Sequence, residues 1–238
     1  LDCCEAKVLS CEKNGENYDI VLDRTVFFPE GGGQRSDVGN IDGVPVTHVS
    51  ERGGIIYHLC NAPFEPGTEV IARINWQTRC DYTEQHSGEH ILSAAFWKLY
   101  SAKNVGFHMS ANLVTIDLDR EFTNEELSSA ESLANSWVRQ NCPVKIYYAS
   151  DSELDRLGLR KATDKVSGIL RIVDIEGVDA CTCCGTHVSS SGGVGLIKIL
   201  RSEHWKGGTR IEFLCGRWAF EHCQLEHNIL SAMANELT

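Results

Sequence analysis

Short apolar runs separated by turn-forming residues dominate the first 76 positions of the chain. The runs are AKVL, YDIVL, VPVTHV, GIIYHL and EVIARI, and segments such as KNGEN and IDG lie between them. Runs of this length, bounded by glycine, asparagine and aspartate, are typical of β-strands joined by turns. Several short strands at this spacing predict a small β-barrel.

The pattern changes to a helical period after Trp76. Apolar residues recur three and four positions apart across residues 79–101, which predicts a helix. We expect Thr83, or a polar residue upstream of it, to cap the N-terminus of this helix. The apolar stripe consists of Ile91, Leu92, Ala95, Phe96 and Leu99.

Strands and helices alternate in the remainder of the chain. Thr123 and Glu126 form a capping box at the start of one helix, which must end before Pro143. A cysteine-rich loop and a hairpin around Lys206–Gly208 follow later. The expected strands cover residues 104–110, 112–118, 143–149, 168–175, 195–204 and 209–216, and the other expected helices cover residues 151–158 and 216–238.

This order of elements predicts an α+β protein. A small N-terminal β-barrel over residues 1–76 precedes an α/β-sandwich domain over residues 77–215. Residues 216–238 form a C-terminal helix without a cap, which is consistent with continuation into a further region. A homodimer formed through such an extension is one assembly that we expect.

Composition places the chain among globular proteins, with 42% hydrophobic and 23% charged residues in 238. The net charge of −11 argues against a surface dominated by charge that binds nucleic acid. No apolar run approaches the ~20 residues that span a bilayer. The first residues, LDCCEAKVL, lack the features of a signal peptide. We therefore expect a cytoplasmic protein that does not contact a membrane.

Eleven cysteines occur at irregular spacings, an odd number that argues against a disulfide scaffold. Reduced thiols clustered near histidine are typical of metal binding. Cys181, Cys183 and Cys184 form the one dense cluster, and His187 closely follows it.

Two pairs of residues have the spacing of metal ligands. His86 and His90 lie four apart on a predicted helix, so their side chains share one face about 5–6 Å apart. Cys183 and His187 form a Cys-x-x-x-His pair with Gly185 between them. Three imidazoles with one thiolate, or two imidazoles with one thiolate and water, are typical of zinc. The spacing therefore predicts one Zn²⁺ per chain.

A metalloprotease is the rival interpretation of the first pair. The segment HSGEH also fits His-x-x-Glu-His, in which Glu89 would act as the general base. Such enzymes need a further acidic ligand downstream, where this chain offers a thiol and a third imidazole. Glu89 also lies about 100° around the helix from its neighbour His90, away from the shared face.

The motifs resemble those of a known family. QHSGEHILSA followed far downstream by CCGTHV resembles the editing domain of alanyl-tRNA synthetase and the free-standing AlaX-type trans-editing proteins. The editing domain of threonyl-tRNA synthetase shares both metal half-motifs. The segment DRTVFFPEGGGQRSDVG is similar to the glycine-rich motif of the alanyl group. Cys184 replaces a glycine of the family pattern, so Cys184 and Cys181 stay alternatives to Cys183 as the thiolate ligand.

The resemblance implies hydrolysis of mischarged Ser-tRNA(Ala), and also of Gly-tRNA(Ala), in trans. An alanine site rejects these amino acids poorly, because such differences give only about 10–200-fold discrimination. The resemblance implies that Thr25 reads the serine hydroxyl and that Gln34 makes a second polar contact. We expect Gly31, Gly32 and Gly33 to let the backbone approach the substrate closely.

Two questions about mechanism stay open from the sequence. The absence of a recognisable Ser-His-Asp set favours water as the nucleophile. Zinc activates water only where a coordination position is open, whereas four protein ligands close the tetrahedron, as in structural sites. A non-catalytic tRNA-binding module with a structural zinc is therefore the alternative. Asp179, four residues before Cys183, is a candidate to orient a ligand.

Basic residues concentrate around the predicted hairpin. They are Lys198, Arg201, Lys206, Arg210 and Arg217. The same stretch holds only two acids, Glu203 and Glu212. We expect Lys206 and Arg210 to contact tRNA phosphates with an affinity that falls with salt. Trp205 either stacks on a base or packs within the hairpin.

Overall fold

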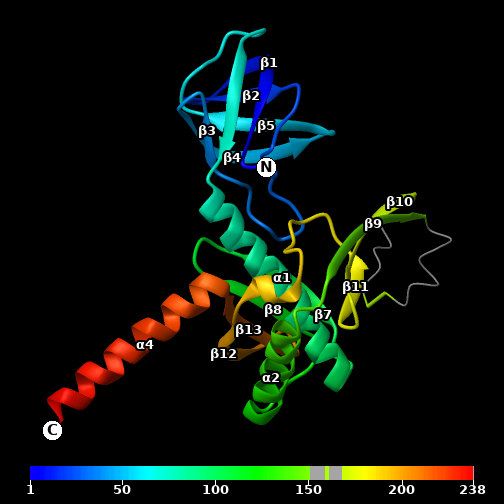
Figure 1. Cartoon of the computed structure of the whole chain (residues 1–238), viewed down its shortest axis with the longest axis vertical. Helices are drawn as coiled ribbons and strands as arrows, with labels where there is room; N and C mark the ends of the chain where they lie inside the picture. Colours follow the sequence, from blue (N-terminus) through cyan, green and yellow to red (C-terminus); the bar gives the residue numbers. More distant parts are fainter. Residues whose placement is uncertain (151–158, 161–167, 238) are drawn as a thin grey trace. The chain divides into compact units, whose positions relative to one another are not determined.

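The computed structural model describes residues 1–150, 159–160 and 168–237. The chain divides into two compact units, Leu1–Tyr82 and Thr83–Thr238. The boundary between them falls within helix α1 (Trp76–Tyr100), which is labelled in Figure 1. The predicted α+β class, with an N-terminal barrel, is confirmed.

Six antiparallel strands close the barrel of the first unit in the order β1-β2-β5-β4-β3-β6. The long first strand closes it, because residues 3–7 pair with β6 and residues 8–14 pair with β2. The strands are β1 (Cys3–Asn14), β2 (Asn17–Leu22), β3 (Gly39–Ile41), β4 (Val44–Arg52), β5 (Ile55–Cys60) and β6 (Glu69–Ile74).

The sequence did not predict β3, which has three residues and a single apolar side chain. Its pairing with β6 depends on Gly39, because a Cβ there would lie 2.1 Å from the carbonyl oxygen of Arg73. Any other residue at this position would push the two strands apart.

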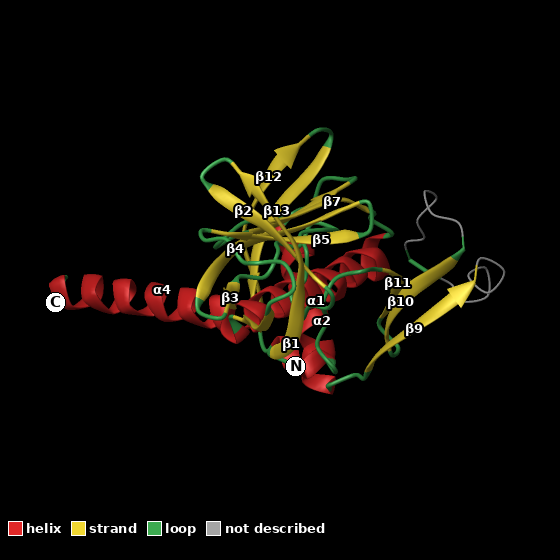
Figure 2. Ribbon diagram, turned by 90° about the horizontal axis from the view of Figure 1, so that it is seen from above, coloured by secondary structure: helices red, strands yellow, loops and turns green. Residues whose placement is uncertain are grey.

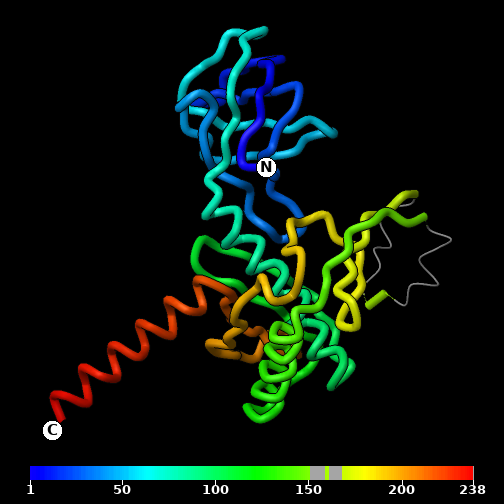
Figure 3. Tube along the Cα trace, in the orientation of Figure 1, coloured from blue at the N-terminus to red at the C-terminus, as the bar shows by residue number. Residues whose placement is uncertain are grey.

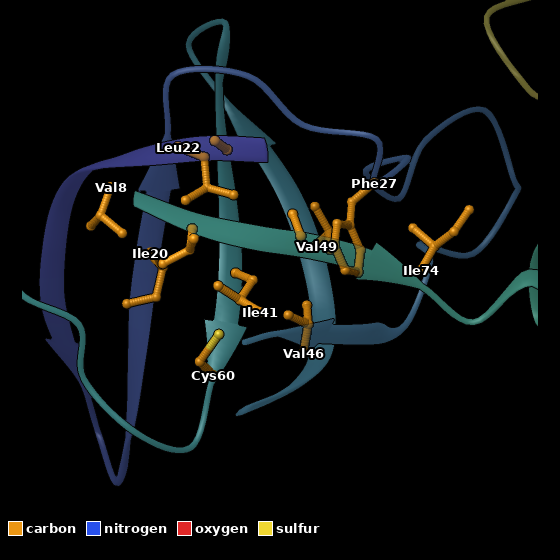
Figure 4. Close-up of a cluster of buried hydrophobic side chains, with 12 residues drawn as sticks. Val8, Ile20, Leu22, Phe27, Ile41, Val46, Val49, Cys60 and Ile74 are labelled. Carbon is orange, nitrogen blue, oxygen red and sulfur yellow. The ribbon is translucent and has the colours of Figure 1, made fainter. Parts of the chain in front are cut away.

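Alternation along the strands builds the barrel core. In β6, Val70, Ala72 and Ile74 are buried, while the residues between them face solvent. Successive side chains of a strand point to opposite faces, so one face of each strand supplies the interior. Figure 4 shows side chains from several strands meeting there, including Ile20, Ile41 and Cys60.

The second unit combines helices with two sheets. The four-stranded sheet has the order β12-β13-β8-β7 and the three-stranded sheet has the order β11-β10-β9, and Figure 2 separates strands from helices by colour. The strands are β7 (Asn104–Met109), β8 (Val114–Leu118), β9 (Val144–Ser150), β10 (Ile169–Ile175), β11 (Asp179–Thr182), β12 (Ile197–Trp205) and β13 (Gly208–Cys215). The other helices are α2 (Asn124–Gln140), α4 (Gly216–Glu236) and the 3-10 helix η1 (Ser191–Val194).

Helix α1 begins earlier than expected, and Thr83 does not cap it. The side chain of Asn75 accepts a hydrogen bond from the amide of Thr78 at 3.1 Å, as an N-cap residue does. The alternative of an upstream polar cap is therefore correct. Leu99, expected in the apolar stripe, is 42% exposed, whereas every residue from 85 to 96 is buried. Polar side chains buried over three turns need hydrogen-bond partners within the protein.

The other expected elements agree with the structure in most places. Thr123 and Glu126 form the predicted capping box of α2, and Asn141 ends that helix in the left-handed conformation. The hairpin turns at Lys206 and Gly207, both with positive φ. The cysteine-rich region is less irregular than expected, because Asp179–Thr182 form β11. The helix expected over residues 151–158 lies outside the described residues. Within the described part of the chain, no helix has the length and apolarity of a membrane span.

Candidate metal centre

Four potential ligands converge in the second unit. Helix α1 places His86 and His90 one turn apart, and the loop after β11 brings Cys183 and His187 against them. Their ligand atoms all lie within 4.8 Å of one another. Figure 3 shows this loop, in yellow, passing alongside α1. Residues almost 100 positions apart thus form one donor set of three imidazoles and one thiolate, which fits a single divalent ion of the zinc type.

The side chains of this donor set lie close to one another. The Sγ atom of Cys183 lies 3.4 Å from Nε2 of His86 and 3.3 Å from Nε2 of His187. The ring centroids of His90 and His187 are 4.5 Å apart. Two imidazole nitrogens therefore lie close to one sulfur, at a separation that two ligands of one tetrahedral ion can have.

The protonation states also suit a metal. Burial raises the pKa of the Cys183 thiol, but hydrogen bonds with His187 and His86 outweigh burial and lower this pKa to about 2. Burial lowers the pKa of His187 to about 3. The sulfur is therefore a thiolate and His187 is neutral at pH 7, which are the forms that bind metals. The amide of Gly185 also donates to Cys183 Sγ at 3.3 Å.

A buried network holds the far side of the His90 ring. Nδ1 of His90 lies 3.2 Å from Sγ of Cys181 and 3.6 Å from a carboxylate oxygen of Asp179. Arg160 donates to both oxygens of Asp179, at 2.7 and 2.8 Å. Burial opposes ionisation of Asp179, but Arg160 and His90 hold the pKa of this carboxyl well below its usual range.

The group of His90, Asp179 and Cys181 orients a candidate metal ligand rather than forming a second metal site. The ligand atoms of His90, Asp179 and Cys181 do lie within 4.8 Å of one another. However, the guanidinium of Arg160 already neutralises Asp179 in a two-bond arrangement. A cation placed here would meet a carboxylate whose charge is already balanced. The arrangement instead fixes the ring of His90, as outer hydrogen bonds do for metal-binding histidines.

Ser87 supports the other ligand pair. Its hydroxyl lies 3.2 Å from Nδ1 of His187 and accepts a hydrogen bond from the amide of Val188 at 3.1 Å. The side chains of Thr83 and Thr186 are 2.7 Å apart and join the same helix to the same loop. The sequence analysis did not single out Ser87, although it lies inside the HSGEH motif.

Close packing positions the ligand-bearing turn of α1. A Cβ at Gly88 would lie 2.1 Å from Sγ of Cys215, so only glycine fits there. The side-chain amide of Gln85 donates to the carbonyl of Cys215 at 2.8 Å and accepts from its amide at 2.7 Å. His86 and His90, on either side of Gly88, are held in place by these contacts, and both are nearly inaccessible to solvent.

The geometry separates the alternatives that the sequence left open. Cys184 is exposed and belongs to neither ligand group of the described residues, and Cys181 belongs to the group around Asp179. Cys183 is the thiol within the four-residue set. Glu89 is buried and accepts hydrogen bonds from Ser93 and Asn104, both at 2.7 Å. Its Oε1 is therefore engaged within the fold, unlike that of a general base that must face a substrate.

The glycine-rich segment lies in the first unit. Gly31 and Gln34 pair across a tight turn in which Gly32 and Gly33 have positive φ, a conformation that favours glycine. Gln34 is buried, unlike a surface amide. Arg79 donates to Asp37 and to the carbonyl of Val26, so both ends of the segment are fixed to the start of α1.

Thr25 lies at the start of this segment and is half-buried. Its hydroxyl is 2.8 Å from Nε2 of His58 and accepts a hydrogen bond from the amide of Phe27 at 3.1 Å. The sequence analysis did not identify His58, because nothing in the GIIYHL strand pattern marks it. The hydroxyl of Thr25 thus has a defined environment, as a residue that reads a substrate group requires.

The basic residues of the hairpin are mostly paired with acids. Arg210 donates to both oxygens of Asp117, at 2.7 and 2.8 Å, and its guanidinium lies 3.7 Å from the ring centre of Trp205. Lys206 lies 5.3 Å from the same ring centre. The other pairs are Lys198 with Glu131, Arg201 with Glu212 and Arg217 with Glu221. The local positive charge is therefore weaker than the sequence suggested.

Comparison with known proteins supports the resemblance. Residues 4–78 match the family model described as tRNA synthetases class II (A), and residues 170–212 match the threonyl and alanyl tRNA synthetase second additional domain. The chain is 36% identical over 234 residues to alanyl-tRNA editing protein Aarsd1-A of Xenopus laevis, covering 94% of this chain and 57% of that protein. Over nearly its whole length, the chain is therefore similar to alanyl-tRNA editing proteins.

Two archaeal proteins are similar to the chain at the same level of identity. The alanyl-tRNA editing protein AlaX-L of Pyrococcus horikoshii is 37% identical over 221 residues, which are 89% of this chain and 55% of that protein. The alanine–tRNA ligase of Pyrococcus furiosus is 36% identical over 225 residues, or 25% of its length. The chain spans little more than half the length of the editing proteins and matches a quarter of the ligase.

Proposed function

We propose that this chain hydrolyses the ester bond of mischarged Ser-tRNA(Ala), and of Gly-tRNA(Ala), in trans and with a bound Zn²⁺. The observation that carries the proposal is the convergence of His86, His90, Cys183 and His187 in a chain related to alanyl-tRNA editing proteins. A separate step must remove the wrong amino acid from the tRNA, because a binding site for alanine cannot strongly reject an amino acid that is smaller or that adds one hydroxyl.

The donor set supports zinc as the metal. Three imidazoles and one thiolate are borderline ligands that suit Zn²⁺ better than Mg²⁺ or Ca²⁺, which prefer oxygen. His86, His90, Cys183 and His187 would hold the ion, and Cys181, Asp179 and Ser87 would orient the rings. A bound Zn²⁺ supplies a positive charge that polarises an ester carbonyl.

The chain's own residues would bind and orient the aminoacyl group. Thr25 offers a hydroxyl that distinguishes serine from alanine, and the turn over residues 31–34 leaves the backbone accessible. Gln34 would assist through its amide, which both donates and accepts. Water is the nucleophile in this proposal: its oxygen adds to the ester carbonyl carbon, the bond to the ribose oxygen breaks, and a free ribose hydroxyl and a free amino acid result.

Contact with tRNA would involve the hairpin tip. Lys206 and Arg210 flank Trp205, which offers a stacking surface beside two cations. Because Asp117 already pairs with Arg210, we expect Lys206 to contribute more of the salt-dependent binding. A homodimer and a cytoplasmic location stay predictions.

A tRNA-binding module with a structural metal is the second candidate. It is favoured by the number of ligands, since four protein donors fill a tetrahedral ion completely. In this case the same residues would stabilise the fold without supporting turnover. The two candidates share every ligand and differ only in catalysis.

Deacylation distinguishes the two candidates. The zinc-loaded protein is incubated with tRNA(Ala) charged with radiolabelled serine, glycine or alanine, and release of amino acid is followed over time. We expect release of serine and glycine above the spontaneous rate, with alanine spared. Binding of Ser-tRNA(Ala) without accelerated release of serine would contradict the proposed hydrolase activity and favour the non-catalytic tRNA-binding module. Arg52→Ala, a barrel-surface change outside the proposed site, is the control for non-specific loss.

A further inference from the structure

A buried histidine lies directly behind the proposed serine reader. The ring of His58, on strand β5, is fully buried and contacts both β2 and the loop that follows it: Nδ1 is 2.9 Å from the carbonyl oxygen of Ile20, and Nε2 is 2.8 Å from Oγ1 of Thr25. The ring also packs edge-on against Phe27 with centroids 5.3 Å apart. A polar ring at this depth must satisfy both nitrogens within the protein.

These partners fix which nitrogen carries the proton. A carbonyl oxygen only accepts hydrogen bonds, so Nδ1 of His58 must be protonated to donate to Ile20. Burial lowers the pKa of His58, so the ring is neutral near pH 7. In a neutral imidazole the second nitrogen has a lone pair. Nε2 is therefore an acceptor, and the hydroxyl of Thr25 must donate to it.

The number of further hydrogen bonds that the Thr25 hydroxyl can make follows from its proton and its lone pairs. A hydroxyl has one proton and two lone pairs. Thr25 gives its proton to His58 and uses one lone pair to accept from the amide of Phe27 at 3.1 Å. One lone pair is left. Thr25 can therefore accept one further hydrogen bond and cannot donate one.

We propose that His58 is a specificity-determining positioning residue, which makes Thr25 an obligate acceptor so that the site recognises a substrate hydroxyl as a donor. This inference rests on the proposed function. It deepens that proposal by stating the polarity of recognition: serine presents an O–H to Thr25, whereas the side chains of alanine and glycine have no such donor. His58 acts on specificity through Thr25 and does not touch the substrate.

Two substitutions at His58 separate this role from simple packing. His58→Gln places an amide oxygen near the position of Nε2 and keeps an acceptor for Thr25. His58→Asn is shorter and retains only a group near the position of Nδ1. Both are polar but differ by one methylene, so the Thr25→Val background described below separates the lost bond to Thr25 from the change in volume. Metal content and circular dichroism establish that each variant is folded.

The assay compares hydrolysis of Ser-tRNA(Ala) and Gly-tRNA(Ala). We expect His58→Asn to lower kcat/KM for the serine substrate roughly tenfold more than for the glycine substrate, as loss of one oriented hydrogen bond would. His58→Gln should keep the ratio close to that of the wild type. In a Thr25→Val background, His58→Asn should leave the ratio unchanged, because its effect passes through Thr25. Equal losses for both substrates, or a persisting effect in that background, would overturn the inference.

A direct measurement of the tautomer does not depend on any variant. Long-range ¹H–¹⁵N NMR of the labelled wild-type protein should show His58 protonated at Nδ1 and bare at Nε2. A proton on Nε2 would overturn the inference. If the wild type hydrolyses neither substrate, the proposed function fails; if it hydrolyses both and His58→Asn leaves the ratio unchanged, only the inference about His58 fails.

Discussion

Arg160 donates two hydrogen bonds to Asp179, and the second oxygen of that carboxylate lies 3.6 Å from Nδ1 of His90. A fixed charge is thus placed behind a candidate metal ligand. Such outer contacts orient the imidazole and raise its basicity, and their loss lowers metal affinity about 10–100-fold.

Asp179→Asn should therefore weaken zinc binding by about that factor while the four ligands stay present. Competition with a chromophoric chelator measures the dissociation constant. Asp174→Asn, on the neighbouring strand β10, is the matched control and should bind zinc like the wild type. Unchanged affinity in Asp179→Asn would exclude the carboxylate from a role in holding His90.

The identity of the thiolate ligand gives a second prediction. Cys183→Ala should reduce bound zinc from about one ion per chain toward none after dialysis against a weak chelator, because one of four donors is lost. Cys184→Ala should retain the metal, since Cys184 is exposed and outside the ligand set. Elemental analysis of both variants decides which cysteine binds the metal. Loss of zinc in Cys184→Ala together with its retention in Cys183→Ala would show that Cys184 supplies the ligand.

Recognition of serine gives a third prediction. Thr25→Val removes the hydroxyl and should lower hydrolysis of Ser-tRNA(Ala) about tenfold more than that of Gly-tRNA(Ala), which has no hydroxyl to read. Thr25→Ser keeps the hydroxyl and serves as the control. Deacylation rates under single-turnover conditions give the ratio. Equal losses for the two substrates in Thr25→Val would remove Thr25 from this role.

Burial of His58 predicts a pH dependence of stability. Burial lowers its pKa in the folded protein, whereas an unfolded histidine titrates near 6.5. The unfolded chain therefore takes up the proton first, so the stabilisation is complete above about pH 6.5 and is lost as the pH falls toward the lowered value. The free energy of unfolding should decline more between about pH 7.5 and 5.5 in the wild type than in His58→Gln. Urea denaturation measures it, and parallel declines would contradict the prediction.

Local signals predicted much of the fold. The capping box at Thr123 and Glu126, the barrel strands other than β3 and the C-terminal helix depend on residues close in sequence, and the structure confirms them. The start of α1 was uncertain, because residue type alone does not distinguish between polar caps such as Thr83 and Asn75. The structure uses Asn75, because the helix extends back to the end of the barrel.

The candidate ligand set could be proposed from the sequence because the spacing within each pair is local. The i, i+4 spacing of His86 and His90 and the Cys183–His187 pair are visible in sequence, and the structure brings the two pairs together. Arg160, Ser87 and His58 were not predictable. Each acts through a contact with a residue distant in sequence or through one hydrogen bond, and no periodicity or motif encodes such contacts.

X-ray absorption at the zinc edge of the purified, zinc-loaded protein tests the proposed metal centre without reference to activity. We predict one sulfur at about 2.3 Å and three nitrogens at about 2.0–2.1 Å, as expected for Cys183 with His86, His90 and His187. Cys184→Ala, which should retain the metal, should keep the same sulfur shell. A shell with two sulfurs, a shell with none, or a protein that retains no zinc would contradict the proposal.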